Sequence, residues 1–478
     1  MTAKHNEPIR LKKTLTLFAM VMMGLAYLQP MTVFDTFGLV QNDSRGHVPT
    51  AYIFALIAML FTAYSYGQMV KRFPSAGSAY TYTQKTVSPH LGFMVGWAAM
   101  LDYLLMPMIN ILLAKLYLHE IMPFIPAWVF VVVLTVLMTG ANIYGLKLVS
   151  NFNKIIVLVQ IGIIVVFTGL MIYKIGTASD LHAQSSNALV TIKPFFSETF
   201  DPFLIIGGAT ILCFSFLGFD GISSLTEETH NARKVVPRAI FLTAFVGGIL
   251  FIIVSYVLEI FFPYQGLHIP SLGINLPLVS HFSDLSSTQP DIIKLVAGTL
   301  VQAIILVFSS VTVIASGLAS QAGVSRLMYV MGRDGVLPKS VFGYLHPKFR
   351  TPIYNIAIAG ALCLIAVNFD ADLGYSLIAF GALVAFTFVN ISVIAKFYVT
   401  EGRRQSFVDT FKYLILPVFG VLTVSSLWFS LDSHAMYLGL GWAGLGFLYM
   451  LVLTRGFKNK MPELHEEIDD EESHDKTE

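Results

Sequence analysis

The chain has 478 residues, of which 55% are apolar and only 12% charged, and its mean hydropathy is +0.70. This composition excludes an ordinary water-soluble domain and is typical of a polytopic membrane protein. The formal net charge of +1 identifies no partner, and we expect the chain to lie in the lipid bilayer and to bind no nucleic acid.

Apolar runs long enough to cross a bilayer follow one another along the chain. A spanning helix needs about 20 mainly apolar residues. Twelve runs qualify, namely 14–40, 49–70, 89–118, 126–145, 150–173, 203–228, 238–262, 292–330, 353–369, 374–399, 413–431 and 434–454. The first run is too long for a cleavable signal, and Cys213 and Cys363 both fall inside predicted spans, which excludes a disulfide framework. The sequence therefore predicts an all-α integral membrane protein.

The basic residues predict how the chain is oriented. With the N-terminus in the cytoplasm, 25 of the 30 Lys and Arg lie inside, and the outside holds only Arg45, Lys115, Lys174, Lys193 and Lys294. Because cytoplasmic loops carry the excess of Lys and Arg, both termini are predicted to be cytoplasmic. Residues 1–13 are then a cytoplasmic tail, 14–455 the membrane domain and 456–478 an acidic cytoplasmic tail.

Two of the runs contain helix-breaking or polar residues at their centres. The stretch 22–30 includes Gly24, Gln29 and Pro30, and the stretch 215–221 surrounds Asp220 with Ser215, Gly218 and Gly221. Hydrocarbon offers the backbone no hydrogen-bond partner, so an interrupted helix at membrane depth is tolerated where it lines a cavity. One such site alone is as well explained by a kink or a close helix contact. A matched pair predicts a secondary transporter with its binding site near the bilayer midplane.

The order of the runs predicts an inverted repeat. Runs one to five (about 14–173) and six to ten (about 203–399) enter the membrane from opposite sides because five is odd, and 413–454 adds two further helices. No residue-level identity between the two sets supports this symmetry, which is inferred from span order.

Several stretches resemble a known transporter superfamily. CFSFLGFDGISSLTEETHNARKVVPRAI at 213–240, FPSAGSAYTY at 73–82 and SRLMYVMGRDGVLPKSVFGYLHPKFRTP at 325–352 resemble the amino acid, polyamine and organocation (APC) superfamily. VMMGLAYLQPMTVFDTFG at 21–38, GHVPTAY at 46–52, GFMVGWAAMLDYLLMPMINILLAK at 92–115 and FGALVAFTFVN at 380–390 are similar to the putrescine importers of enteric bacteria. The resemblance covers about residues 11–455. It implies a five-plus-five inverted-repeat fold, LeuT-like, with two added helices, and proton-driven putrescine import across an inner membrane.

Three carboxylates at membrane depth are candidate functional residues, because buried charge is costly there. Asp220 either pairs with a substrate ammonium or accepts hydrogen bonds from the backbone amides of the adjoining half-helix. Asp102 would pair with the second ammonium of an alkyl diammonium, and the adjacent Tyr103 would offer its chain an aromatic surface. The alternative is that Asp102 forms a hydrogen bond to a neighbouring helix and that Tyr103 is a packing residue. Asp35 is an entrance residue, or else a solvated or capping one.

Other expected site residues flank the breaks and the inner end. Phe214 resembles the aromatic position that closes over substrate in the superfamily, although a packing Phe is a strong alternative. Glu227 and Glu228 end the sixth run and, with Arg326, form an inner gate or exposed ion pairs of no measurable effect. Glu259 is expected to be interfacial. The remaining predicted substrate contacts are Gly24, Ala26, Tyr27, Ser215 and Gly218.

Two departures from the superfamily bear on coupling and substrate. Gln160 occupies the position where some proton-coupled carriers have a lysine in place of sodium, and glutamine cannot titrate, which puts that coupling mechanism in doubt. The first run has Gly24, Leu25 and Ala26 instead of the Gly-Ser-Gly pattern that binds an α-carboxylate, which disfavours amino acids.

The predicted function is alternating-access import of putrescine, coupled to protons rather than sodium. The alternative is a permease or exchanger for cationic or other amino acids. The stretches 174–202 and 263–291 contain no metal-ligand cluster, nucleophile elbow or phosphate loop, so we expect no enzyme, cofactor or metal. A channel or membrane sensor does not account for paired breaks, and the sequence leaves the oligomeric state open.

Overall fold

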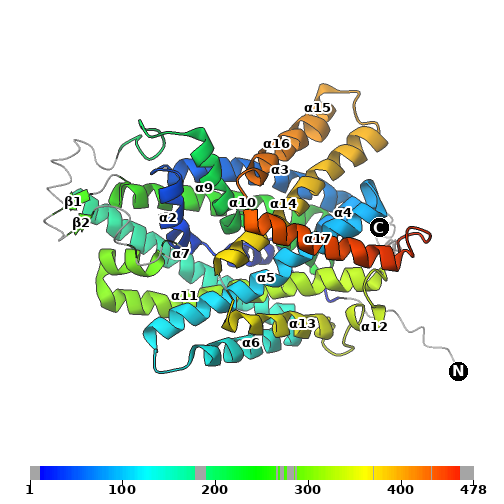
Figure 1. The fold of residues 1–478 in the computed structure, drawn as a ribbon, viewed down its shortest axis with the longest axis horizontal. Helices are drawn as coiled ribbons and strands as arrows, with labels where there is room; N and C mark the ends of the chain where they lie inside the picture. Colours follow the sequence, from blue (N-terminus) through cyan, green and yellow to red (C-terminus); the bar gives the residue numbers. More distant parts are fainter. Residues whose placement is uncertain are drawn as a thin grey trace, which may run out of the picture.

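The computed structural model describes residues 11–177, 190–264, 267–269, 274–276, 282, 285, 288–369, 371–431 and 433–462. It is a bundle in which most of the long helices run roughly along the longest axis of the molecule (Figure 1). Residues 1–10 of the predicted N-terminal tail and 463–478 of the predicted acidic tail lie outside the described residues.

The helices follow the predicted apolar runs. The first part of the chain forms α1 (Leu17–Leu28), α2 (Thr32–Asp43), α3 (Val48–Arg72), α4 (Ser78–Thr86), α5 (Pro89–Ile121), α6 (Ala127–Tyr144) and α7 (Leu146–Thr177). The middle part forms α9 (Pro202–Phe216), the 3-10 helix η1 (Gly221–Glu228), α10 (Ala232–Phe261), α11 (Gln289–Arg333), α12 (Lys339–Phe342), α13 (Ile353–Cys363) and the 3-10 helix η3 (Leu364–Val367). The last part forms α14 (Ala371–Val393), the π-helix η4 (Ile394–Thr400), α15 (Phe407–Thr410), the π-helix η5 (Phe411–Ile415), α16 (Leu416–Trp428) and α17 (Ser433–Leu453).

The structure confirms an all-helical membrane-spanning domain. Among the described residues, ten helices are long and apolar enough to cross a membrane, or eleven when the α1–α2 pair, bent by 45°, counts as one span. The expected run at 353–369 forms a shorter apolar helix, Ile353–Val367. All twelve expected runs therefore appear as helices, whereas twelve complete spans and the inverted repeat stay predictions.

One short hairpin lies outside the spans. Strands β1 (Leu267–Ile269) and β2 (Ile274–Leu276) pair antiparallel within the segment that joins α10 to α11. The hairpin lies at one end of the bundle, and the last turns of α17 lie at the other (Figure 1). We call these the hairpin end and the opposite end.

Capping and kinking explain where several helices begin and bend. Ser88 precedes Pro89 at the start of α5 and accepts a hydrogen bond from the Leu91 amide at 3.1 Å, a common N-terminal arrangement. In α11, Gly298 has a φ of 82°, which interrupts the helix. Lys174 of α7 donates to the Val296 carbonyl at 2.6 Å, so a backbone acceptor at this kink has a partner.

Helices α1 and α5 lie inside the bundle. α1 packs against α7, α10 and α11, and α5 packs along α11 and α14. Because these neighbours surround them, side chains at the centres of α1 and α5 are shielded from lipid. Met23, Tyr27, Asp102 and Tyr103 are each less than 5% exposed.

Candidate functional site

The first break lies between α1 and α2. Gln29 ends α1 in the left-handed region at φ 51°, and Pro30 follows it without an amide proton to continue the helix. The prediction of a break is confirmed, but the unwound turn comes at the end of the predicted stretch 22–30. Gly24 and Ala26 lie within the regular helix α1. A side chain at Gly24 would come within 2.5 Å of Thr243 Oγ1, so Gly24 permits close packing of α1 on α10.

The second break lies between α9 and η1. Leu217 is extended, and Gly218 has a φ of 120°, a conformation that L side chains rarely adopt. The Gly218 amide donates to Asp220 Oδ1 at 3.2 Å. The carboxylate of Asp220 therefore orders the unwound backbone beside it, as the structural alternative for this residue anticipated.

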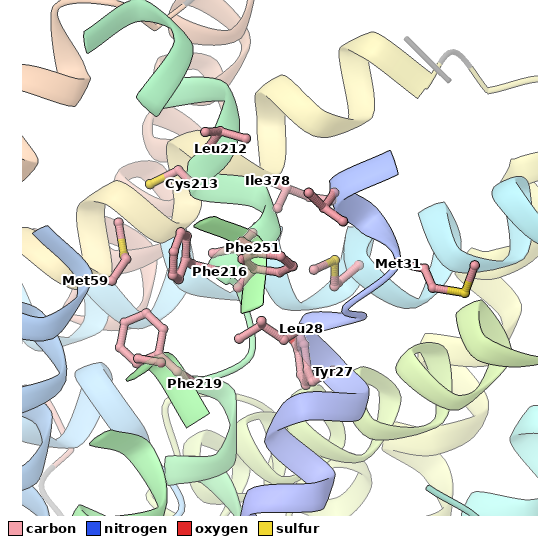
Figure 2. Close-up of a cluster of buried hydrophobic side chains, with 14 of the residues drawn as sticks. Tyr27, Leu28, Met31, Met59, Leu212, Cys213, Phe216, Phe219, Phe251 and Ile378 are labelled. Atoms are coloured by element: carbon pink, nitrogen blue, oxygen red, sulfur yellow. The ribbon is translucent and has the colours of Figure 1, made fainter. Parts of the chain in front are cut away.

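The two breaks are in contact with each other. A Cβ at Gly218 would lie 2.6 Å from Tyr27 Cβ, and one at Gly221 would lie 2.8 Å from Tyr27 Cε2. Ser316 of α11 donates to the Tyr27 carbonyl at 2.8 Å. Figure 2 shows Tyr27 and Leu28 at the end of α1, close to the break that follows Phe216. The last turn of α1 therefore packs directly on the unwound part of α9.

The structure brings Asp220, Tyr103 and Asp102 together at this contact. The Tyr103 hydroxyl donates to Asp220 Oδ2 at 2.8 Å, and all three residues are buried. Asp102 lies close enough to Asp220 for the two carboxylates to interact electrostatically. A Cβ at Gly381 of α14 would lie 2.8 Å from Asp102 Cβ, so α14 approaches α5 closely at this carboxylate.

Neither carboxylate is neutralised by a Lys or Arg of the described part of the chain. Among the described residues, no Lys or Arg forms an ion pair with Asp102 or Asp220. Asp102 Oδ1 is buried and has no hydrogen-bond partner in the described part of the chain. A buried carboxylate without a counter-ion is costly and calls for an explanation. A ligand with two ammonium groups would supply both missing partners.

Tyrosine side chains lie near the two carboxylates, and further aromatic rings lie beside the second break. Tyr66 of α3 meets Phe219 edge to face at 6.1 Å, and Tyr27 and Tyr66 both lie within electrostatic range of the two acids. Phe214 is half-buried, and its ring lies 4.6 Å from that of Tyr375 on α14. Such rings can offer apolar and cation-π surface to a cation.

Ser215 and Gln160 are both fully buried near the breaks. Ser215 lies beside the Tyr52 hydroxyl of α3. Gln160 is on α7, whose Val157 packs against Met22, Leu25 and Ala26 of α1. The Gln160 Nε2 atom has no hydrogen-bond partner among the described residues. The residue at the expected coupling position is therefore a buried, neutral group on the helix that faces α1.

The hairpin end holds two buried carboxylates. Tyr117 donates to Asp35 Oδ1 at 2.9 Å, and Asp35 is 4% exposed. Gln41 donates to Glu259 Oε1 at 3.0 Å, and Glu259 is also 4% exposed. The alternative of a solvated Asp35 is therefore wrong, because Tyr117 from a distant helix covers it. The interfacial position expected for Glu259 stays a prediction. The entrance role of Asp35 stays a prediction.

The opposite end divides the expected gate residues between two ion pairs. Arg326 donates to both oxygens of Glu228 at 3.0 and 3.2 Å, with both side chains at most 3% exposed. Glu227 instead accepts both bonds from Arg333 at 3.2 Å and one from the Ala76 amide. The alternative of an exposed ion pair is therefore wrong for Glu228 and Arg326. Their gating role stays a prediction.

A titratable group lies next to the second pair. The Tyr80 hydroxyl donates to Asp334 Oδ2 at 2.9 Å, directly after α11 ends at Arg333. Burial raises the pKa of Asp334 to about 6, and the hydrogen bond from Tyr80 opposes this shift. This end of the molecule therefore contains a carboxyl group that titrates close to neutrality.

Comparison with known proteins identifies the family. The family model described as "Amino acid permease" matches residues 18–453. The chain belongs to this family. It is 53% identical over 459 residues to the low-affinity putrescine importer PlaP of Escherichia coli strain K12, covering 96% of this chain and 97% of the relative. It is 50% identical over 192 residues to the probable low-affinity putrescine importer PlaP of Klebsiella pneumoniae, covering 40% of this chain and 98% of the relative. A methylthioribose transporter of Bacillus subtilis is 27% identical over 477 residues, covering 93% of this chain and 94% of the relative.

Sequence reasoning missed several side chains that contact residues at the two breaks. Tyr66, Tyr375 and Ser316 come from helices other than the broken ones, and nothing local in their sequence context distinguishes them from packing residues. Arg333 was detectable, because SRLMYVMGRDG at 325–335 puts it two turns after Arg326 on one helix face. The prediction named only the first arginine.

Proposed function

We propose that this permease is a secondary active importer of putrescine that works by alternating access. The observation that carries the proposal is the pair of buried carboxylates, Asp102 and Asp220, at the contact between two broken helices. No Lys or Arg among the described residues forms an ion pair with either. Two carboxylates flanked by tyrosines complement a short alkyl chain with an ammonium at each end. The 53% identity to an importer named for putrescine supports the same substrate.

A permease or exchanger for cationic amino acids is the second candidate. The family description favours it, because the matching model is that of amino acid permeases. An amino acid carries an α-carboxylate, which would have to lie beside Asp220 or find donors elsewhere. The helical Gly24–Leu25–Ala26 turn of α1 lacks the Gly-Ser-Gly pattern for that group, so we favour the diamine.

Proton coupling is part of the proposal. Gln160 is neutral at every pH, so coupling would use a carboxyl group and not this position. Sodium is the less favoured ion. We further propose that the protein lies in an inner membrane with both termini in the cytoplasm, because 25 of the 30 basic residues then lie inside, and that its first ten helices form an inverted repeat.

Uptake by the purified protein in liposomes tests the substrate assignment. Labelled putrescine should accumulate, and unlabelled putrescine should compete with it far better than arginine or lysine does. If arginine competes as well as putrescine and is itself taken up, the amino acid alternative is correct.

A further inference from the structure

A basic cavity lies at the boundary of the bundle, at the start of α10. It occupies about 510 Å³ where the last turn of α3 meets the first turns of α10. Its basic lining consists of Lys71, Arg233, Lys234 and Arg238. All four side chains are exposed, and no carboxylate is among the described residues that line the cavity. The cavity is therefore a concentrated site of positive charge.

The neighbouring arginine is engaged elsewhere. Arg72 lies 3.5 Å from Glu401, which also pairs with Arg403 at 2.9 Å. Glu401, directly after η4, therefore pairs with Arg72 of α3 and with Arg403. Within the described part of the chain, the ion pairs of Glu401 are with residues outside the cavity lining.

The lining changes from basic to apolar along α10. Pro237, Phe241 and Leu242 complete the cavity, and Phe241 stacks on Phe245 one turn further on, with ring centroids 6.0 Å apart. Phe241 and Phe245 are 44% and 42% exposed. Residues three and four apart share a helix face, so Arg238, Phe241 and Phe245 form one stripe. The stripe begins with charge at the end of the helix and continues as aromatic surface toward its middle.

We propose that this cavity binds the headgroup of an anionic phospholipid, with an acyl chain along Phe241 and Phe245. Basic pockets between helices at a membrane surface attract anionic headgroups, and each nearby Lys or Arg strengthens the attraction. A free phosphate would use the four cations but gain nothing from the aromatic stripe. The juxtaposition of charge and exposed rings on α10 therefore favours a lipid over a soluble anion. The proposal rests on the membrane-spanning fold and not on the transported substrate.

Lipid retention by the purified protein tests the proposal. The probe is phosphatidylglycerol, detected by native mass spectrometry after release from nanodiscs of phosphatidylglycerol and phosphatidylcholine. The test variant combines Lys71→Gln, Arg233→Gln, Lys234→Gln and Arg238→Gln. The matched control removes four other exposed charges by Lys339→Gln, Lys412→Gln, Lys458→Gln and Lys460→Gln. Wild type and control should retain phosphatidylglycerol at least about tenfold better than the test variant.

Two results would overturn the lipid site. One is equal retention by the test variant and the control. The other is displacement of phosphatidylglycerol by inorganic phosphate at equal concentration, which would make the cavity a small-anion site. If the fourfold variant does not fold, the double variant Lys234→Gln with Arg238→Gln replaces it, and retention by that variant equal to wild type would equally refute the proposal.

Discussion

Replacing Asp220 by Asn is expected to abolish or severely weaken putrescine uptake, with little loss of folded protein. Asn has nearly the shape of Asp and can keep both local contacts, accepting from the Gly218 amide and donating to the Tyr103 oxygen in place of the present bonds of 3.2 and 2.8 Å. The loss is therefore confined to the negative charge. Removing one partner of a buried, hydrogen-bonded charge pair costs about 2–5 kcal/mol, which corresponds to a loss of affinity of roughly 30-fold or more.

The same reasoning predicts discrimination against monoamines. Butylamine has one ammonium, so it leaves either Asp102 or Asp220 charged and unpaired, or forces one of them to take up a proton. Both carboxylates are only 1% exposed, so water does not compensate for the missing partner. Putrescine should therefore compete at least about 30-fold better than butylamine in the wild type. The Asp102→Asn variant keeps only one of the two carboxylates, so the difference in affinity between putrescine and butylamine should be smaller in this variant.

Competition against labelled putrescine in membranes of matched expression measures both effects. Asp409→Asn serves as the control, because it removes a carboxylate on the short helix α15 outside the buried site. The control should behave as wild type. Wild-type affinity for putrescine in both Asp220→Asn and Asp102→Asn would show that the two-carboxylate site is wrong.

Four further perturbations have defined outcomes. Gln160→Leu should change uptake affinity but keep its dependence on pH, because glutamine does not titrate; loss of that dependence would put the coupling site here. Arg326→Gln should lower the unfolding free energy in detergent by about 3–5 kcal/mol, because it leaves Glu228 buried without its partner. Arg333→Gln should lower it by about 1 kcal/mol or less, because the Arg333–Glu227 pair is 36% and 21% exposed. Equal losses for the two variants would show that burial does not decide the strength of these pairs. The pKa of Asp334 is about 6 in the native protein against an ordinary 3.8, so the native state holds this proton more tightly than the unfolded state does. The unfolding free energy should therefore decrease by at most about 3 kcal/mol as the pH rises from about 4 to 6, and Asp334→Asn should remove this pH dependence. A reporter fused after residue 235 should read cytoplasmic, and periplasmic activity there would overturn the topology.

The sequence predicted the breaks because their causes are local. Pro30 lacks an amide proton and Gly218 tolerates a positive φ, and the residue type alone predicts both properties. The position of the first break was less accurate. Whether Gly24 unwinds or packs depends on Thr243 of α10, 219 residues away, and the structure shows packing.

Burial of the charged groups was the least predictable feature. Asp35 is covered by Tyr117, and Glu228 by Arg326, across separations of 82 and 98 residues. Such pairings are a property of how the helices pack and leave no periodic signal in either helix. The sequence assigned Asp102 and Asp220 to the two ends of a diammonium substrate but could not show that they are close to each other. Their proximity comes from the packing of α5 against the break after α9.

Uptake of labelled putrescine by the purified protein in liposomes, with proton and sodium gradients imposed separately, tests the central claim most directly. An inward proton gradient should drive accumulation above the external concentration, a sodium gradient should not, and dissipating the proton gradient should release the accumulated putrescine. Absence of putrescine uptake under either gradient, with active uptake of an amino acid in the same vesicles, would contradict the proposed function.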